Sequence, residues 1–299
     1  MVTFKRPELA DRELINNYLA KQKSRNCEST FANTYLWSRF FGIEFAEINN
    51  TLVFKDQQEQ PSFVFPVGST EDVKGTIDIL MESCREQNIP YQMHNITPEQ
   101  FARIEKWYPA EFEIEYNRNA ADYVYEREKL ALLSGKKYHG KKNHTNKFQK
   151  LYPDWSYESI DSRNLEDCFQ MALKWRNANG CEDDEEKNAE ICVTLNALRL
   201  FNELELCGGL LRANREIVAF SIGEPLCDDT FVVHIEKAFA DIPGAYPMIN
   251  QQFVIHETEG YMYINREEDM GEEGLRTAKL SYRPIFLVEK GRVRKRGDS

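Results

Sequence analysis

The 299-residue sequence lacks the features that mark membrane, secreted and metal-stapled proteins. No apolar run approaches the roughly 20 residues that a membrane helix needs, and no apolar stretch follows the charged residues near the start. The seven cysteines include no Cys-x-x-Cys pair, and the five histidines have no metal-ligand spacing. We therefore expect a cytoplasmic protein with reduced thiols, without membrane insertion and without a structural metal.

Basic charge and nucleotide-binding glycine loops are also missing. The formal net charge is -11, whereas a general nucleic-acid coat protein needs a basic surface to neutralise phosphates. Neither a Walker pattern nor a dinucleotide glycine pattern occurs. Apolar residues make up 41% of the chain, and its length suits two domains of about 150 residues better than one. We therefore predict a globular chain with real cores.

The two halves of the sequence resemble each other weakly, which indicates an internal duplication. Each half opens with an extended segment and then a helical pattern, over residues 8–21 and 165–175. An Asn-Arg pair lies near the end of each half, between a strand pattern and a further helical pattern. The pairs are Asn117-Arg118 and Asn265-Arg266, and the helices that follow are predicted over 123–133 and 272–281. Spacing drift that mimics a repeat is the alternative.

The boundary between the halves is predicted near Pro153, which gives an N-terminal domain over 1–153 and a C-terminal domain over 154–299. Strand hairpins lie between the opening and closing segments of each half. The C-terminal domain is the better candidate for binding a ligand, because the place in the first half that matches its glycine-containing loop has no glycine.

A strand, a loop and a helix in the second half form the first candidate site. Alternating apolar residues predict a strand over 231–238, and a helical pattern follows over 247–257. The loop between them, 240–246, contains Gly244 and Ala245. Because a helix N-terminus presents unpaired N–H groups and a positive dipole end, this loop is a candidate phosphate site. An ordinary connection is the alternative.

His234 and Glu236 share one face of the predicted strand over 231–238. In acyl transfer the attacking amine must lose a proton, so an imidazole or carboxylate at this position is a candidate base. The alternative is a hydrogen-bonded polar pair beside the core.

A basic run over 136–150 stands out in this acidic protein, with six lysines and no acid. Such sorted charge favours a phosphate-bearing partner, and we predict phosphate contacts from Lys137, Lys141 and Lys142. Transfer RNA is one candidate partner. A solvated linker between the domains is the alternative.

A polar segment near the C-terminal end adds three candidate ligand-binding residues. Asn265 lies at the exit of a strand pattern in the second half, and Arg276 and Lys279 lie on one edge of the helix predicted after it. Most of this segment also fits a helix stabilised by its own charges, which is the alternative.

Four segments together resemble the bacterial family related to the C-terminal domain of phosphatidylglycerol lysyltransferase. They are DYVYEREKL at 122–130, SGKKYHGKKNH at 134–144, NREEDMG at 265–271 and GLRTAK at 274–279. The resemblance covers essentially the whole chain. It implies an α+β fold of two tandem GNAT-like domains, each a mixed central sheet flanked by helices, and a relation to Fem-type transferases that use aminoacyl-tRNA.

The resemblance also implies an acyltransferase that moves an acyl or aminoacyl group from a phosphate-bearing carrier to an amine or hydroxyl. Glu236 or His234 would act as base, and Tyr282 or Tyr263 would protonate the leaving group, by analogy with GNAT enzymes. The donor is coenzyme A or acyl-CoA in one version and charged tRNA in the other. Only Gly244 matches the GNAT pyrophosphate-loop pattern, so both donors stay open. A non-catalytic member that binds a ligand is the third alternative.

Overall fold

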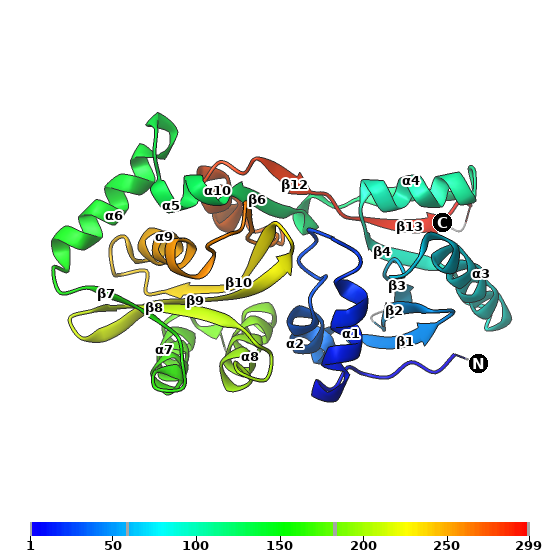
Figure 1. Cartoon of the computed structure of the whole chain (residues 1–299), viewed down its shortest axis with the longest axis horizontal. Helices are drawn as coiled ribbons and strands as arrows, with labels where there is room; N and C mark the ends of the chain where they lie inside the picture. The colour runs from blue at the N-terminus through cyan, green and yellow to red at the C-terminus, as the bar shows by residue number, and fades with distance from the viewer. Residues whose placement is uncertain (1, 58–59, 182–183, 298–299) are drawn as a thin grey trace. The chain divides into compact units, whose positions relative to one another are not determined.

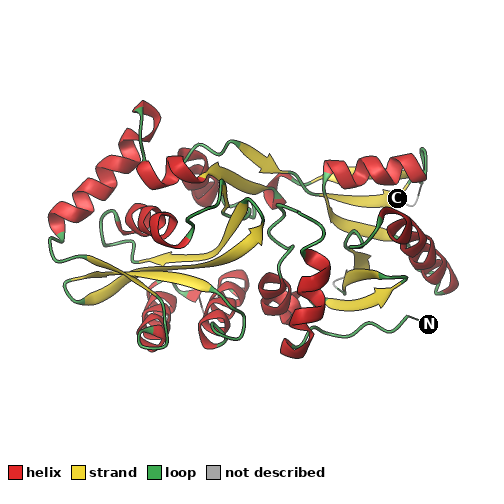
Figure 2. Cartoon of the chain, viewed as in Figure 1, coloured by secondary structure: helices red, strands yellow, loops and turns green. Residues whose placement is uncertain are grey.

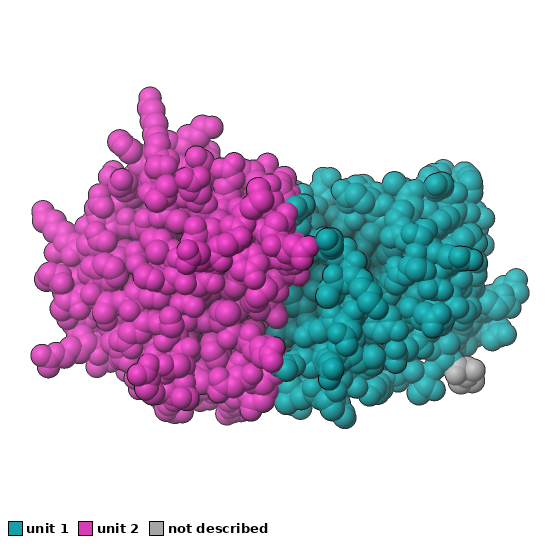
Figure 3. Space-filling view, viewed as in Figure 1, with its two compact units in different colours: residues 1–122, 268–272, 287–299 teal, residues 123–267, 273–286 magenta. Residues whose placement is uncertain are grey.

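The computed structural model describes residues 2–57, 60–181 and 184–297. The chain forms two compact units, coloured separately in Figure 3. Unit 1 comprises residues 1–122, 268–272 and 287–299, and unit 2 comprises residues 123–267 and 273–286. The predicted α+β class is confirmed, because the chain contains two mixed sheets flanked by helices (Figures 1 and 2).

Unit 1 is built around a six-stranded sheet with the order β1-β2-β3-β4-β13-β5. Its strands are β1 (Glu44–Ile48), β2 (Thr51–Asp56), β3 (Ser62–Phe63), β4 (Gln92–Ile96), β5 (Phe112–Tyr116) and β13 (Gly291–Lys295). Its helices are η1 (Leu9–Asp11), α1 (Arg12–Leu19), α2 (Phe31–Phe41), α3 (Thr70–Glu86), α4 (Pro98–Trp107) and η2 (Arg118–Ala120). Strand β13 comes from the end of the chain and lies antiparallel between β4 and β5.

Helices α3 and α4 complete the main core of unit 1. Ser69 caps α3 by accepting a hydrogen bond from the Asp72 N–H, and Thr97 caps α4 in a capping box with Gln100. Apolar side chains of both helices pack in one cluster with strand residues such as Met93. The caps fix where each helix starts, and burial of the apolar faces holds the helices on the sheet.

Unit 2 contains most of the second sheet, whose order is β12-β6-β11-β10-β9-β8-β7. Its strands are β6 (Asp122–Glu126), β7 (Ser156–Ser159), β8 (Cys207–Ala213), β9 (Glu216–Cys227), β10 (Thr230–Ala238), β11 (Tyr263–Asn265) and β12 (Phe286–Val288). Its helices are α5 (Arg127–Leu132), η3 (Lys136–Tyr138), α6 (His139–Leu151), α7 (Leu165–Ala178), α8 (Glu185–Arg199), α9 (Ala245–Glu257) and α10 (Glu273–Ser281). Figure 1 shows α9 on one face of the sheet and α7 with α8 on the other.

The compact units divide the chain differently from the predicted boundary at Pro153. The first unit ends its long segment at residue 122, because β6 pairs with β11 in the second sheet. In return, β13 pairs with β4 and β5 in the first sheet. Each sheet thus takes a strand from the far half of the sequence, which a boundary drawn from composition does not anticipate.

Two other expectations need correction in detail. The helix predicted over 123–133 is wrong in its first part, because residues 122–126 form β6 and only Arg127–Leu132 form α5. The segment 136–150 is no linker but forms η3 and α6 within unit 2. Within the described residues, no helix is long and apolar enough to cross a bilayer.

Candidate functional site

The candidate site of unit 2 lies where the parallel strands β10 and β11 part. Their backbones pair over only three residues of each strand, which run from Thr230 to Val232 in β10. Beyond Val232, β10 pairs only with β9 on its other side, with a register shift between Val233 and Ile235. Two residues beyond Val232, His234 and Glu236, are partly exposed, and the other residues of β10 are buried. Side chains rather than backbone therefore bridge the gap.

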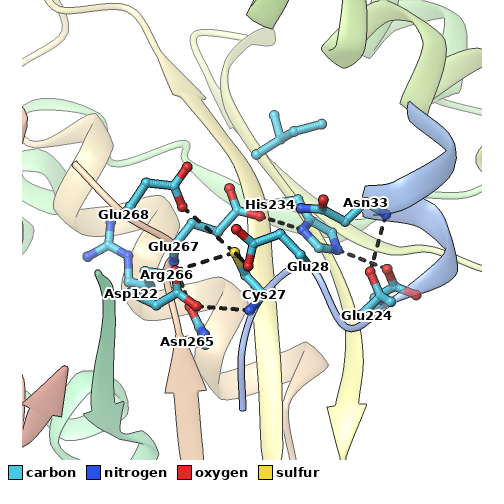
Figure 4. Close-up of polar contacts among 12 residues, drawn as sticks. Cys27, Glu28, Asn33, Asp122, Glu224, His234, Asn265, Arg266, Glu267 and Glu268 are labelled. Atoms are coloured by element: carbon cyan, nitrogen blue, oxygen red, sulfur yellow. Dashed lines mark hydrogen bonds and ion pairs between the residues drawn. The ribbon is translucent and has the colours of Figure 1, made fainter. Parts of the chain in front are cut away.

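His234 lies between two carboxylates (Figure 4). Its Nδ1 is 2.7 Å from Glu267 Oε1 and its Nε2 is 2.9 Å from Glu224 Oε1. Burial alone would lower the pKa of His234, but the hydrogen bonds and negative charges of Glu224 and Glu267 raise it to about 10. The ring is therefore an imidazolium at neutral pH, and both of its nitrogens donate hydrogen bonds.

Glu236 is the centre of a second polar group. Its Oε1 accepts a hydrogen bond of 2.9 Å from Arg266 Nη2, and its Oε2 accepts one of 3.1 Å from Asn250 Nδ2. The side chains of Glu236 and Arg266 are 13% and 11% exposed, so this ion pair is well shielded from water. Arg266 Nη1 and Asn250 Oδ1 are buried and have no hydrogen-bond partner among the described residues. These two atoms leave the hydrogen bonding around the Glu236 carboxylate incomplete among the described residues.

Lys141 and Tyr282 adjoin this pair. The Lys141 ammonium lies 4.0 Å from the centre of the Tyr282 ring, and the Arg266 guanidinium lies 4.8 Å from it. Burial and the positive charge of Arg266 lower the pKa of Lys141 to about 8, against the opposing effect of Glu236. Burial raises the pKa of Tyr282, whose hydroxyl therefore stays protonated at neutral pH.

Asn265 and Lys279 support the backbone of the turn that carries Arg266. Asn265 is fully buried, and its Oδ1 accepts a hydrogen bond of 2.7 Å from the N–H of Glu267. Lys279 Nζ donates to the carbonyl oxygens of Arg266, at 2.6 Å, and Glu267, at 3.2 Å. These contacts fix the direction in which the Arg266 side chain leaves the strand.

Helix α6 covers the N-terminus of α9. Gly244 has φ +87°, and a Cβ atom on it would lie 2.4 Å from the carbonyl oxygen of His144. Ala245 is buried in a cluster with Phe148 of α6. The glycine is therefore required by the close approach of two backbones, and this need is independent of any phosphate.

The predicted site residues fall into three groups. The structure brings together Glu236, Lys141 and Tyr282. It places Asn265, Lys279, Gly244, Ala245 and His234 in supporting contacts, and it leaves Lys137 and Lys142 exposed and Arg276 half-buried on α10. No chemical role was predicted for Arg266 or Asn250. The Asn-Arg pair at residues 265–266 was the signal for the first, and the sequence carries none for the second.

A buried charge cluster in unit 1 was not predicted from the sequence. Lys290 is 1% exposed, and its Nζ lies 2.7 Å from Asp122 Oδ1 and 2.8 Å from Glu28 Oε1. Figure 4 shows Cys27 beside Asp122, where the Cys27 N–H donates to Asp122 Oδ2 at 2.9 Å. Burial raises the pKa of the Cys27 thiol, so it stays protonated.

This cluster includes the one set of metal-ligand atoms found among the described residues. Cys27, Asp122 and Glu268 offer atoms within 4.8 Å of one another. The Lys290 ammonium is 3.6 Å from Cys27 Sγ and 4.0 Å from Glu268 Oε2, so a cation already lies among these groups. We therefore assign no metal to them.

The fold and the centre at Glu236 define the class: an α+β protein with a polar site at the parting of two parallel strands. The chain belongs to the family described as phosphatidylglycerol lysyltransferase, C-terminal, which matches residues 19–290. The resemblance inferred from the sequence is thereby confirmed, as is a general relation to transferases of this fold.

Three related proteins place the chain more closely. A conserved protein of unknown function from Bacteroides thetaiotaomicron is 39% identical, with a TM-score of 0.94 over 99% of this chain and 100% of that one. The C-terminal domain of a putative lysylphosphatidylglycerol synthetase from Agrobacterium fabrum shares the fold, with 14% identity and a TM-score of 0.70 over 97% of this chain and 93% of that one. An uncharacterised protein of Mycoplasmoides gallisepticum is 25% identical over 190 residues, which are 62% of this chain and 60% of that protein.

Proposed function

We propose that the protein transfers an aminoacyl group from a charged carrier to an amine or hydroxyl acceptor at the Glu236 centre of unit 2. One observation carries the proposal: Arg266 Nη1 and Asn250 Oδ1, both buried and without partners among the described residues, flank the same carboxylate. An aminoacyl ester offers a carbonyl oxygen and an α-ammonium a few bonds apart. These two groups match a free donor next to a free acceptor.

Arg266 would stabilise the oxyanion that forms on the carbonyl. Its other nitrogen, Nη2, is fixed to Glu236 at 2.9 Å, so the guanidinium is oriented before any ligand binds. Such preorganised donors contribute most where water is excluded, and the Arg266 side chain is only 11% exposed. Asn250 Oδ1 and the negative charge of Glu236 would hold the α-ammonium.

Lys141 and Tyr282 would handle the protons. A lysine with a pKa of about 8 has a substantial neutral fraction near physiological pH and can take the proton that the acceptor loses. The acceptor oxygen or nitrogen then bonds to the carbonyl carbon, and the bond from that carbon to the carrier oxygen breaks. Tyr282 is protonated and would supply the proton to the departing oxygen. In this scheme Glu236, predicted as base, is the group that orients the substrate.

The packing of α6 favours an aminoacyl carrier over coenzyme A. The α9 N-terminus, where a pyrophosphate would bind, is in contact with the backbone of His144 through Gly244. Lys137 and Lys142 are exposed and available to a polyanion. The family name suggests lysyl as the transferred group and phosphatidylglycerol as the acceptor, and both belong to the proposal.

The test supplies both carriers to the purified protein. Charged tRNAs carrying labelled amino acids are incubated with phosphatidylglycerol vesicles, and transfer is followed as label entering the lipid phase. Acyl-CoA species are assayed in parallel through release of free thiol. We expect aminoacyl transfer without thiol release.

Variants at the centre then identify the site. Arg266→Lys keeps the charge but loses the guanidinium fork, and we expect about a 100-fold loss of rate. Lys174→Ala removes an exposed lysine of the same unit and serves as the control. Thiol release without aminoacyl transfer, or equal rates for Arg266→Lys and the control, would refute the proposal.

A further inference from the structure

A pocket in unit 1 is separate from the centre described above. It has a volume of about 60 Å³, and all its lining residues belong to unit 1. Its lining includes the apolar side chains of Leu19, Phe54 and Val64. Glu28, Asp56 and His94 also line it. Since a water molecule occupies about 30 Å³ in the liquid, this space suits the end of a chain a few heavy atoms long.

Asp56 has one carboxylate oxygen without a hydrogen-bond partner among the described residues. The residue is 9% exposed, and this oxygen, Oδ1, is buried. Its Oδ2 lies 3.7 Å from His94 Nε2. Burial raises the pKa of Asp56 to about 6, partly offset by the charge of Arg292 and by a hydrogen bond from the backbone of Ser62. A carboxylate in this state gains from a cationic hydrogen-bond donor.

The other charges of the pocket already have partners. Glu28 is neutralised by Lys290, at 2.8 and 2.9 Å, and Asn95 Nδ2 donates to it at 3.1 Å. Lys55 forms an ion pair of 2.9 Å with Glu44.

His94 adds no positive charge, because burial lowers its pKa to about 4. Its Nδ1 is engaged with the Ser62 hydroxyl at 2.9 Å. The lining therefore offers a ligand the negative charge of Asp56 together with apolar side chains.

We propose that this pocket binds the terminal ammonium of a primary alkylamine, with the ammonium on Asp56 and the alkyl chain along Leu19, Phe54 and Val64. A neutral ligand would bring no charge to the Asp56 carboxylate, and an anion would be repelled by it. The site is independent of the proposed transferase centre, since binding needs no turnover.

Titration calorimetry with n-butylammonium tests the proposal, with 1-butanol as the neutral probe of similar size. We expect saturable binding of the amine at millimolar concentration or below, and much weaker binding of the alcohol. Asp56→Asn keeps the shape and removes the charge, so we expect about a tenfold weaker Kd, since a charged hydrogen bond contributes more than a neutral one. Glu99→Gln removes an equal charge at an exposed position of α4, and we expect a Kd within about twofold of the original.

A second measurement protects the test against a misfolded variant. Nuclear Overhauser contacts between the butyl chain and the methyl groups of Leu19 and Val64 should appear in the unmodified protein. Two further amines, 1,4-diaminobutane and Nα-acetyl-lysine amide, distinguish a free diamine from a lysine side chain as the natural source. Equal binding of both would mean that the terminal ammonium alone is recognised, which supports the proposal. Absence of amine binding, equal binding of butanol, or an equal effect of both variants would overturn it.

Discussion

Replacing Lys290 by methionine removes the ammonium from the buried cluster of unit 1 and keeps a chain of similar length. Three contacts below 3 Å are lost, one of 2.7 Å to Asp122 and two of 2.8 and 2.9 Å to Glu28. The Asp122 side chain is 0% exposed and cannot be rehydrated in place, whereas the Glu28 side chain is 31% exposed and can. The cost should therefore come mainly from one uncompensated carboxylate.

Removing one partner of a buried ion pair costs about 3–5 kcal/mol. Asp122 keeps its hydrogen bond from the Cys27 N–H, so we expect a loss of about 3 kcal/mol, at the lower end of that range. This is a large part of the roughly 5–15 kcal/mol that stabilises a typical domain. Urea unfolding measures the change, and hydrogen exchange of β13 assigns it to unit 1, because two units need not unfold together.

Two variants make this test specific. Lys295→Met lies on the same strand but is exposed, and we expect its free energy of unfolding to change by no more than about 0.5 kcal/mol. Adding Asp122→Asn to Lys290→Met removes the uncompensated charge and should restore most of the lost stability. If Lys290→Met costs less than about 1 kcal/mol, or if the second change restores nothing, the assignment of the cost to Asp122 is refuted.

Three further predictions concern unit 2. If Lys141 accepts the proton, the transfer rate should rise with pH to a plateau with a midpoint near 8, and Lys141→Ala should lose this rise while Lys142→Ala keeps it. Because the pKa of His234 is raised, its protonation stabilises the fold fully below about pH 6.5, and this contribution should be lost as pH rises toward 10. In urea unfolding, the stability of His234→Gln should not show this decrease with pH. Gly244 has φ +87°, and a Cβ on it would lie 2.4 Å from a carbonyl oxygen, so Gly244→Ala should lower the free energy of unfolding by about 2 kcal/mol or more. Gly140 in α6 has open space around it, so Gly140→Ala should be neutral or slightly stabilising. A similar loss for both variants in urea unfolding would contradict the packing argument.

Local patterns predicted the framework of unit 2 well. The alternation over 231–238 identifies β10, which spans Thr230–Ala238, and the glycine and proline around residue 244 mark the start of α9. These elements form from contacts between near neighbours in sequence. The segment at residues 122–126 was mistaken for a helix, because its strand conformation depends on pairing with β11, some 140 residues away.

The chemistry was predictable only where one side chain had a recognisable role. Glu236, Lys141 and Tyr282 were predicted as site residues from the sequence. Arg266 and Asn250, which contact Glu236, were not. Arg266 reaches Glu236 across 30 residues of chain. Lys290 lies 263 residues from Cys27. Lys290 precedes a glycine, a pattern that is typical of a solvated turn. Its burial results from contacts with residues that are distant in the sequence.

The two Asn-Arg pairs have similar turns but different surroundings. Asn117 and Asn265 make the same turn, in which the side-chain oxygen accepts a hydrogen bond from the N–H two residues on, at 3.0 and 2.7 Å. Both turns follow a strand, β5 in unit 1 and β11 in unit 2. Arg118 Nη1 lies 3.4 Å from Asp269 Oδ2, whereas Arg266 Nη2 donates to Glu236 and its Nη1 has no hydrogen-bond partner among the described residues.

The sheets explain this difference. In unit 1 the last strand, β13, lies between β4 and β5 and pairs with both, so backbone hydrogen bonds fill the space beside β5. In unit 2 no strand enters between β10 and β11 among the described residues, and their pairing ends after three residues. Polar side chains must then satisfy one another across the opening, and wherever they leave an atom unpaired, a ligand can complete the set. The two units thus differ in that backbone pairing fills the space beside β5, whereas polar side chains span the opening beside β10.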